Sequence, residues 1–158
     1  MRLCTIAALV FALLTAGCSA NTGHQATSPA SPLRPDPHTA PALLAIATAF
    51  NHDYDTGDYA SVYARWDARS QAIIGGADYV QRHMQCPGAH TASHTEDDSP
   101  GPDGAWVVHY EIGGEQLIDY WFYLGRRWVF DLILSNPDMV PLYKMSPQQY
   151  VKTLGCGH

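Results

Sequence analysis

Residues 106–130 read WVVHYEIGGEQLIDYWFYLGRRWVF, and this stretch decides the fold. Apolar and aromatic residues alternate with polar ones along much of it, and this period of two is typical of β-strands. Gly113-Gly114 is a two-residue hairpin signal, and Gly125-Arg126 is a second turn. We therefore predict three antiparallel strands, over residues 105–112, 115–124 and 127–134.

The part of the chain before these strands carries helix signals. Apolar side chains recur at helical spacing between Thr39, a capping residue, and Gly57, which ends the helix. Asp58 is suited to cap a second helix. Residues 77–84 are predicted to form a further helix. The side chains expected to face inward on it are Tyr79, Val80 and Met84.

Residues 85–104 contain Gly, Pro, His, Asp, Ser and Thr with almost no aliphatic side chains, which predicts a loop. A last helix is expected to begin at Ser146-Pro147 and to end at Gly155. The order is helices, an antiparallel meander and a short helix. It predicts an α+β domain whose N-terminal helices pack on a curved antiparallel sheet of three or more strands.

The first residues have the pattern of an export signal. Arg2 precedes an apolar run over residues 3–14, and small residues follow within LTAGC at residues 14–18. The run is about half of the roughly 20 residues that a transmembrane helix needs. We therefore predict a cleaved signal peptide over residues 1–17 rather than a membrane span.

A cysteine directly after Ala-Gly resembles the lipobox of bacterial lipoproteins. The resemblance implies that Cys18 is diacylated and becomes the first residue of the mature chain. Two acyl chains suffice for stable anchoring in a membrane. The expected localisation is the cell membrane, with a lipid anchor on its extracytoplasmic face. Residues 18–38 are rich in Ser, Thr, Pro and Ala and are predicted to form a disordered tether. A single globular domain over residues 39–158 should follow it.

The charge of the chain argues against a nucleic-acid partner. Its formal net charge is −6 at pH 7, and its basic residues are scattered, with Arg126-Arg127 the only adjacent pair. Binding to nucleic acid needs a concentrated basic face. The sequence also lacks phosphate-binding loops and zinc-protease or serine-hydrolase motifs, and we expect no cofactor.

Residues 40–158 resemble a group of small secreted lipoproteins of unknown function from high-GC Gram-positive bacteria. The stretches that carry the resemblance are AFNHDYDTGDY at residues 49–59, DYVQRH at residues 78–83 and DYWFY at residues 119–123. That group implies no activity. The order of elements also resembles the cone-shaped α+β folds of the ketosteroid-isomerase-like and cystatin-like groups.

Cys86 and Cys156 remain once Cys18 is lipidated and Cys4 is removed with the signal. Two leftover cysteines in an exported chain are most often joined, so we expect a disulfide. The alternatives are free thiols or metal ligands.

Four histidines suggest a possible metal site. His83, His90 and His94 occur close together, and His158 would approach them through the predicted disulfide. Imidazole and the neighbouring carboxylates suit zinc or copper. The alternative interpretation is a solvated polar loop, because the spacing matches no known metal motif.

Asp119 is the strongest catalytic candidate, because it shares a strand face with Leu117 and Trp121. A carboxyl in an apolar pocket has a raised pKa and can act as a general base, with His109 or Tyr120 polarising the substrate. The alternative is a structural role, in which Asp119 pairs with Arg126 or Arg127. Asp131 and His109 are expected to point to solvent from the opposite face of the sheet.

Three functions follow from these candidates. The first is a non-enzymatic, membrane-anchored module that binds an envelope protein or an apolar ligand through its aromatic side chains. The second is a small pocket enzyme of the isomerase or hydratase type that uses Asp119. The third is a metal-binding lipoprotein that uses residues 83–94.

Overall fold

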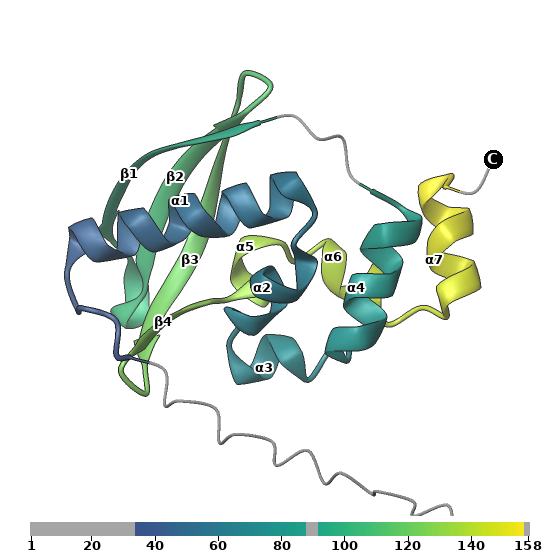
Figure 1. The fold of residues 1–158 in the computed structure, drawn as a ribbon, viewed down its shortest axis with the longest axis horizontal. Helices are drawn as coiled ribbons and strands as arrows, with labels where there is room; N and C mark the ends of the chain where they lie inside the picture. Colours follow the sequence, from purple (N-terminus) through teal and green to yellow (C-terminus); the bar gives the residue numbers. More distant parts are fainter. Residues whose placement is uncertain (1–33, 88–91, 157–158) are drawn as a thin grey trace, which may run out of the picture. The chain divides into compact units, whose positions relative to one another are not determined.

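The computed structural model describes residues 34–87 and 92–156. The predicted signal peptide, Cys18, most of the tether, His90 and His158 lie outside the described residues. The elements are α1 Ala40–Thr56, α2 Tyr59–Ala64, α3 Ala68–Gln71, α4 Gly76–Gln85, β1 Ser93–Pro100, the 3-10 turn η1 Pro102–Gly104, β2 Trp106–Ile112, β3 Glu115–Leu124, β4 Arg127–Phe130, α5 Leu132–Ser135, α6 Met139–Tyr143 and α7 Pro147–Leu154 (Figure 1).

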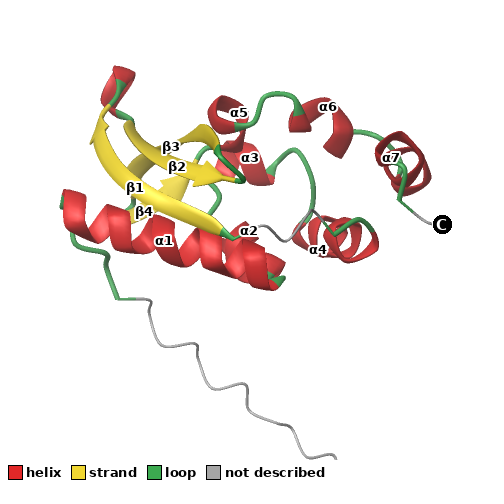
Figure 2. Cartoon of the chain, turned by 90° about the horizontal axis from the view of Figure 1, so that it is seen from above, coloured by secondary structure: helices red, strands yellow, loops and turns green. Residues whose placement is uncertain are grey.

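The domain is α+β, as predicted. Four antiparallel strands form one sheet in the order β1-β2-β3-β4. Helix α1 lies along one face of this sheet, which we call the inner face (Figure 2). Several strand residues that point inward are fully buried, among them Val108, Trp121 and Trp128. Phe50 of α1 packs edge-to-face on Trp121, with 5.1 Å between the ring centroids.

Both predicted hairpin turns are confirmed. Gly113 and Gly114 have φ angles of 61° and 88°, and Gly125 and Arg126 have φ angles of 55° and 65°. Two consecutive residues with positive φ match the right-handed twist of the flanking strands. The first turn places Val108 opposite Asp119, and this register sets the inner face of β3.

The predicted loop over residues 85–104 is wrong, because part of it forms β1. This strand reads SHTEDDSP and pairs antiparallel with β2, with a bulge between Thr95 and Asp97. A polar strand at a sheet edge shows no hydrophobic alternation that a sequence reading could detect. Side chains of α1 hold it in place, since Asp55 accepts hydrogen bonds from Ser93, and Asn51 donates one to Thr95.

The third strand is shorter than predicted, because it ends at Phe130 and not at residue 134. Asp131 caps α5 by accepting a hydrogen bond from the Leu134 N–H at 3.0 Å. The prediction that Asp131 points to solvent is wrong as well, since it is fully buried and pairs with Arg69. Arg69 also contacts Asp67, the cap of α3, at 3.2 Å. This bridge ties the helical half of the domain to the end of the sheet.

The predicted tether ends too late, because Asp36 and Pro37 already contact the β3–β4 hairpin. The Asp36 carboxylate accepts the Trp128 N–H at 3.0 Å and pairs with Arg65 at 2.7 Å. The backbone oxygen of Pro37 accepts the Trp128 Nε1–H at 2.9 Å. His38 stacks on Tyr123 with a centroid distance of 4.0 Å. The ordered contacts of the domain therefore begin before residue 39.

The predicted disulfide is confirmed between Cys86 and Cys156, whose Cα atoms are 5.3 Å apart. It joins the end of α4 to the residues that follow α7. The helices α4 and α7 lie side by side (Figure 1). Arg82 of α4 adds links to the chain just before α7, because its guanidinium donates to the backbone oxygens of Leu142 and Met145. Cross-linking a loop of this length stabilises a fold by about 4 kcal/mol in the chain-entropy model.

One prediction for the α4 face is wrong. Met84 is 71% exposed, whereas Tyr79, Arg82 and His83 are the buried residues of this helix. Polar groups of the C-terminal part of the chain face this side of α4, since Arg82 donates to the backbone oxygen of Met145 and His83 Nε2 lies within hydrogen-bond distance of the Tyr143 hydroxyl. No helix within the described residues is long and apolar enough to cross a membrane.

Candidate functional site

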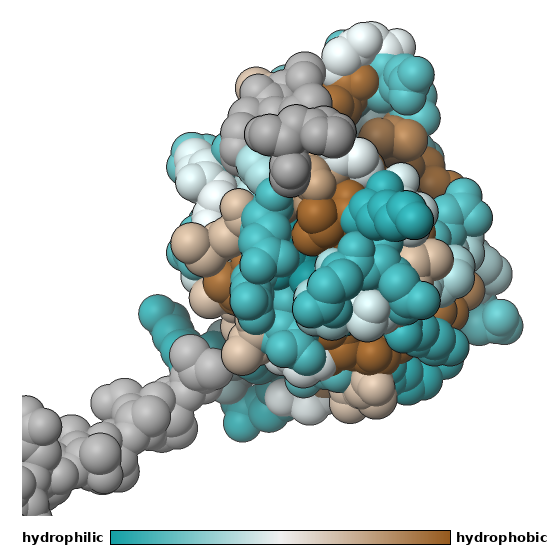
Figure 3. All heavy atoms as spheres, turned by 90° about the vertical axis from the view of Figure 1, so that its right-hand side faces the viewer, coloured by the Kyte–Doolittle hydropathy of each residue, from teal (hydrophilic) through white to brown (hydrophobic). Residues whose placement is uncertain are grey.

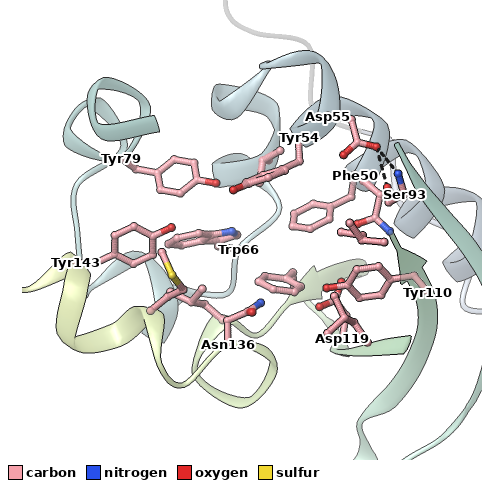
Figure 4. Close-up of a pocket in the computed structure, with 17 residues that line it drawn as sticks. Phe50, Tyr54, Asp55, Trp66, Tyr79, Ser93, Tyr110, Asp119, Asn136 and Tyr143 are labelled. Carbon is pink, nitrogen blue, oxygen red and sulfur yellow. Dashed lines mark hydrogen bonds between the residues drawn. The ribbon is translucent and has the colours of Figure 1, made fainter. Parts of the chain in front are cut away.

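A cavity of about 260 Å³ lies between the inner face of the sheet and the helices. Its walls come from α1, α2, α4, α5 and α6 and from all four strands, together with residues between these elements (Figure 4). Leu117 of β3 lines the cavity and is 38% exposed. The cavity is therefore open to solvent beside this residue. The volume is just below the roughly 300–1,000 Å³ of pockets that take drug-sized ligands.

Asp119 is the carboxyl group at the sheet side of this cavity. Asp119 is 2% exposed, and burial raises the pKa of its carboxyl to about 7. A hydrogen bond with the Tyr110 hydroxyl acts in the opposite direction and lowers this pKa. Its Oδ1 atom is buried without a hydrogen-bond partner. The pairing with Arg126 or Arg127 that the sequence suggested is not formed. Asp119 is therefore a carboxyl that has lost water without gaining a cation.

Aromatic rings form most of the opposite wall. Phe50, Tyr54, Trp66, Tyr79 and Tyr143 all line the cavity, and Figure 4 shows the Tyr54 and Tyr79 side chains pointing toward each other. The ring centroids of Trp66 lie 4.6 Å from Tyr79 and 5.9 Å from Tyr143. Burial raises the pKa of Tyr54 to about 12, so its hydroxyl stays neutral. The Trp66 Nε1–H is buried without an acceptor.

His83 stands behind this wall as a neutral core histidine. Its Nε2 lies 2.8 Å from the Tyr143 hydroxyl, and its ring packs on Tyr79 with a centroid distance of 4.4 Å. Desolvation lowers its pKa to about 4, because a charged imidazole would lose its hydration among aromatic rings. The structure thus places His83 where it orients two cavity rings.

The described residues do not bring the predicted metal ligands together. His83 is buried in the aromatic cluster, whereas His94 is an exposed residue of β1. Cys86 and Cys156 are joined to each other. Within residues 34–87 and 92–156, no three His, Cys, Asp or Glu side chains are grouped to hold a metal ion.

The predicted partners of Asp119 lie on the outer face of the sheet. Tyr120 follows Asp119 in β3 and therefore points the other way. His109 sits opposite Asp97, and its Nδ1 lies 2.6 Å from an Asp97 carboxylate oxygen. The structure brings Asp119 together with Tyr110 instead.

A second hollow lies between α2 and α4, around Tyr63, Val80 and Met84. Its lining is mostly apolar but includes Gln81 and Gln85, and in the described part of the chain none of its side chains carries a buried polar atom without a partner. On the face over α4 and α7, apolar side chains occur in small patches among polar ones (Figure 3).

The sequence pattern missed several of the cavity residues. Tyr110 alternates along the sequence with Val108 and Ile112, but nothing marked it as the neighbour of Asp119. Trp66, Tyr79 and Tyr143 were indistinguishable from ordinary core aromatics, because local spacing does not show that their rings leave a cavity between them. The unpaired Trp66 Nε1–H becomes visible only in three dimensions.

Comparisons of the chain with protein-family models, with curated proteins and with solved structures find no match.

The raised pKa of Asp119 predicts a pH dependence of stability. Because the folded-state pKa of about 7 exceeds the ordinary value of 3.8, the native state binds the proton more tightly than the unfolded chain does. This group therefore stabilises the fold below about pH 4, and the stabilisation is lost as the pH rises through 7. A shift of this size corresponds to about 4 kcal/mol.

Asp119→Asn removes this titration. We expect the unfolding free energy of the variant, relative to the parent, to rise by about 4 kcal/mol between pH 4 and pH 8 in urea titrations. Other titrating groups, such as His83, cancel in this difference. Asp78→Asn is the matched control, because it makes the same chemical change at an exposed position of α4. A flat difference for Asp119→Asn would show that the carboxyl is hydrated.

Proposed function

We propose that this chain is an extracytoplasmic lipoprotein whose domain binds a small, largely apolar molecule in the inner cavity. The observation that carries the proposal is the unpartnered Oδ1 of Asp119 inside a cavity walled by aromatic rings. A buried polar atom without a partner costs about 1–3 kcal/mol, and a ligand that supplies the hydrogen bond recovers this energy. The rings add the favourable burial of apolar surface.

The composition of the walls supports a ligand with an apolar body. Phe50, Trp66 and Phe130 present apolar ring surface, and the tyrosines add ring faces with only a single hydroxyl each. A few polar groups among many apolar ones is the usual make-up of a small-molecule site, where the polar groups set the orientation. Asp119 and Trp66 would orient the ligand here, one as acceptor and the other as donor.

A pocket enzyme of the isomerase or hydratase type is the second candidate. The favouring observation is the pKa of about 7 for Asp119, which suits a general base. Binding without turnover is the better-supported function, because His109 and Tyr120 do not face the cavity. The tyrosines that do face it, such as Tyr110 and Tyr143, have raised pKa values and are poor proton donors.

The lipid anchor accounts for where such a module would work. Acylated Cys18 would hold the chain in the membrane, and the residues up to about Arg34 would act as the tether. Asp36 and His38 then dock on the β3–β4 hairpin. A ligand captured from the extracytoplasmic space would stay close to the membrane surface.

The anchor predicts a specific loss. Replacing Cys18 with Ala should abolish incorporation of labelled fatty acid and shift the protein from the detergent phase to the aqueous phase in a Triton X-114 partition. Cys4→Ala, inside the predicted signal peptide, is the matched control and should keep the label. Retained label in Cys18→Ala would contradict the anchor.

The cavity predicts a blockable site for an apolar probe. We expect 2-phenylethanol to bind saturably to the lipidated protein in nanodiscs, measured by calorimetry against empty nanodiscs. Leu117→Trp, which places a larger side chain at the cavity, should weaken this binding at least about tenfold, or about 1.4 kcal/mol. Leu124→Trp is the control, because Leu124 belongs to the same strand but does not line the cavity.

Equal binding to both tryptophan variants would place the probe elsewhere and contradict the proposed function. If Leu117→Trp does not fold, Asn136→Trp gives the same test, because Asn136 is an exposed residue at the cavity.

A further inference from the structure

We propose that the occupant of the inner cavity is an organic amine, with its protonated nitrogen against Asp119 and its apolar body among the aromatic rings. This inference rests on the proposed function and names the chemical class of its ligand. It follows from the charges, the rings and the unpartnered oxygen that the cavity presents.

The charges of the lining favour a cation. Among the described residues, two carboxyl groups, Asp55 and Asp119, belong to the lining, and no Lys, Arg or His side chain does. Asp55 accepts two hydrogen bonds from Ser93, at 2.9 and 2.8 Å, whereas Oδ1 of Asp119 has no partner. An ammonium group provides both the hydrogen bond and the charge that an ionised Asp119 lacks.

Two basic side chains near the cavity, His83 and Arg82, do not supply a positive charge to Asp119. His83 is neutral, because desolvation lowers its pKa to about 4. The guanidinium of Arg82 donates to two backbone oxygens and lies 5.2 Å from the ring centroid of Tyr150. Neither residue can serve as the counterion of Asp119. The positive charge beside an ionised Asp119 would therefore come from the ligand.

The aromatic wall suits the same ligand. Tyr54, Trp66, Tyr79 and Tyr143 present their rings around one volume, which can bury the apolar body of an amine whose nitrogen is held at Asp119. The body of the ligand can carry a hydrogen-bond acceptor as well, because the Trp66 Nε1–H has none. The net charge of −6 adds a general attraction for cations.

Ligands of other charge fit less well. A neutral alcohol can donate a hydrogen bond to Asp119 but leaves its charge uncompensated. An anion would meet the carboxylate directly and would bind only if Asp119 kept its proton. The relative affinities of a matched amine, alcohol and carboxylate therefore show which ligand charge the site prefers.

The test compares phenethylamine, 2-phenylethanol and 3-phenylpropanoate by calorimetry at pH 8, on the full lipidated protein in nanodiscs with empty nanodiscs as blank. We expect the amine to bind at least about tenfold more tightly than the alcohol, and the anion to bind most weakly. In Asp119→Asn the dissociation constants of amine and alcohol should converge. In Asp78→Asn, the exposed control, the preference should stay.

Two results would overturn this inference while leaving the proposed function standing. One is equal binding of amine and alcohol that Leu117→Trp still blocks, and the other is tightest binding of the anion. A preference for the amine that persists in Asp119→Asn would also overturn it. If no probe binds, both the inference and the proposed function fail.

Discussion

The properties of the site depend on the desolvation of one carboxyl group, that of Asp119. The hairpin register puts Asp119 on the inner face of β3, and the helices over that face remove its water. Burial lets the group hold its proton up to about pH 7, with no cation among the described residues of the lining, although the hydrogen bond with the Tyr110 hydroxyl acts in the opposite direction. An inner face built only for stability would carry an apolar residue here, because an unpaired carboxyl is expensive to bury.

Specific links hold the helical half at the end of the sheet, in addition to the aromatic packing that the two parts share. Arg69 pairs with Asp131, and the Cys86–Cys156 disulfide joins α4 to the end of α7. His83, bonded to Tyr143, keeps the rings of α4 and α6 packed on each other. These links help to place the aromatic wall opposite β3, with the cavity between them.

The predictable parts of the fold are those set by local chemistry. Alternation and glycine turns predict β2 and β3, and a capping residue with a terminal glycine predicts α1. Strand β1 could not be predicted, because its stability comes from pairing at an edge and from α1 side chains such as Asp55. Asp119 was identified as unusual from its apolar neighbours, but its partner Tyr110 and the outward position of His109 depend on tertiary packing. That is why the candidate site was only half predicted.

The most direct test of the central claim is a titration of the Asp119 side-chain carboxyl by carbon-13 NMR, assigned through Asp119→Asn. A buried, unpaired carboxyl should titrate with a midpoint near 7 in the empty protein. A midpoint near the ordinary 3.8 would show that water or a protein cation already reaches the group. In that case the cavity would have no unmet charge to offer a ligand.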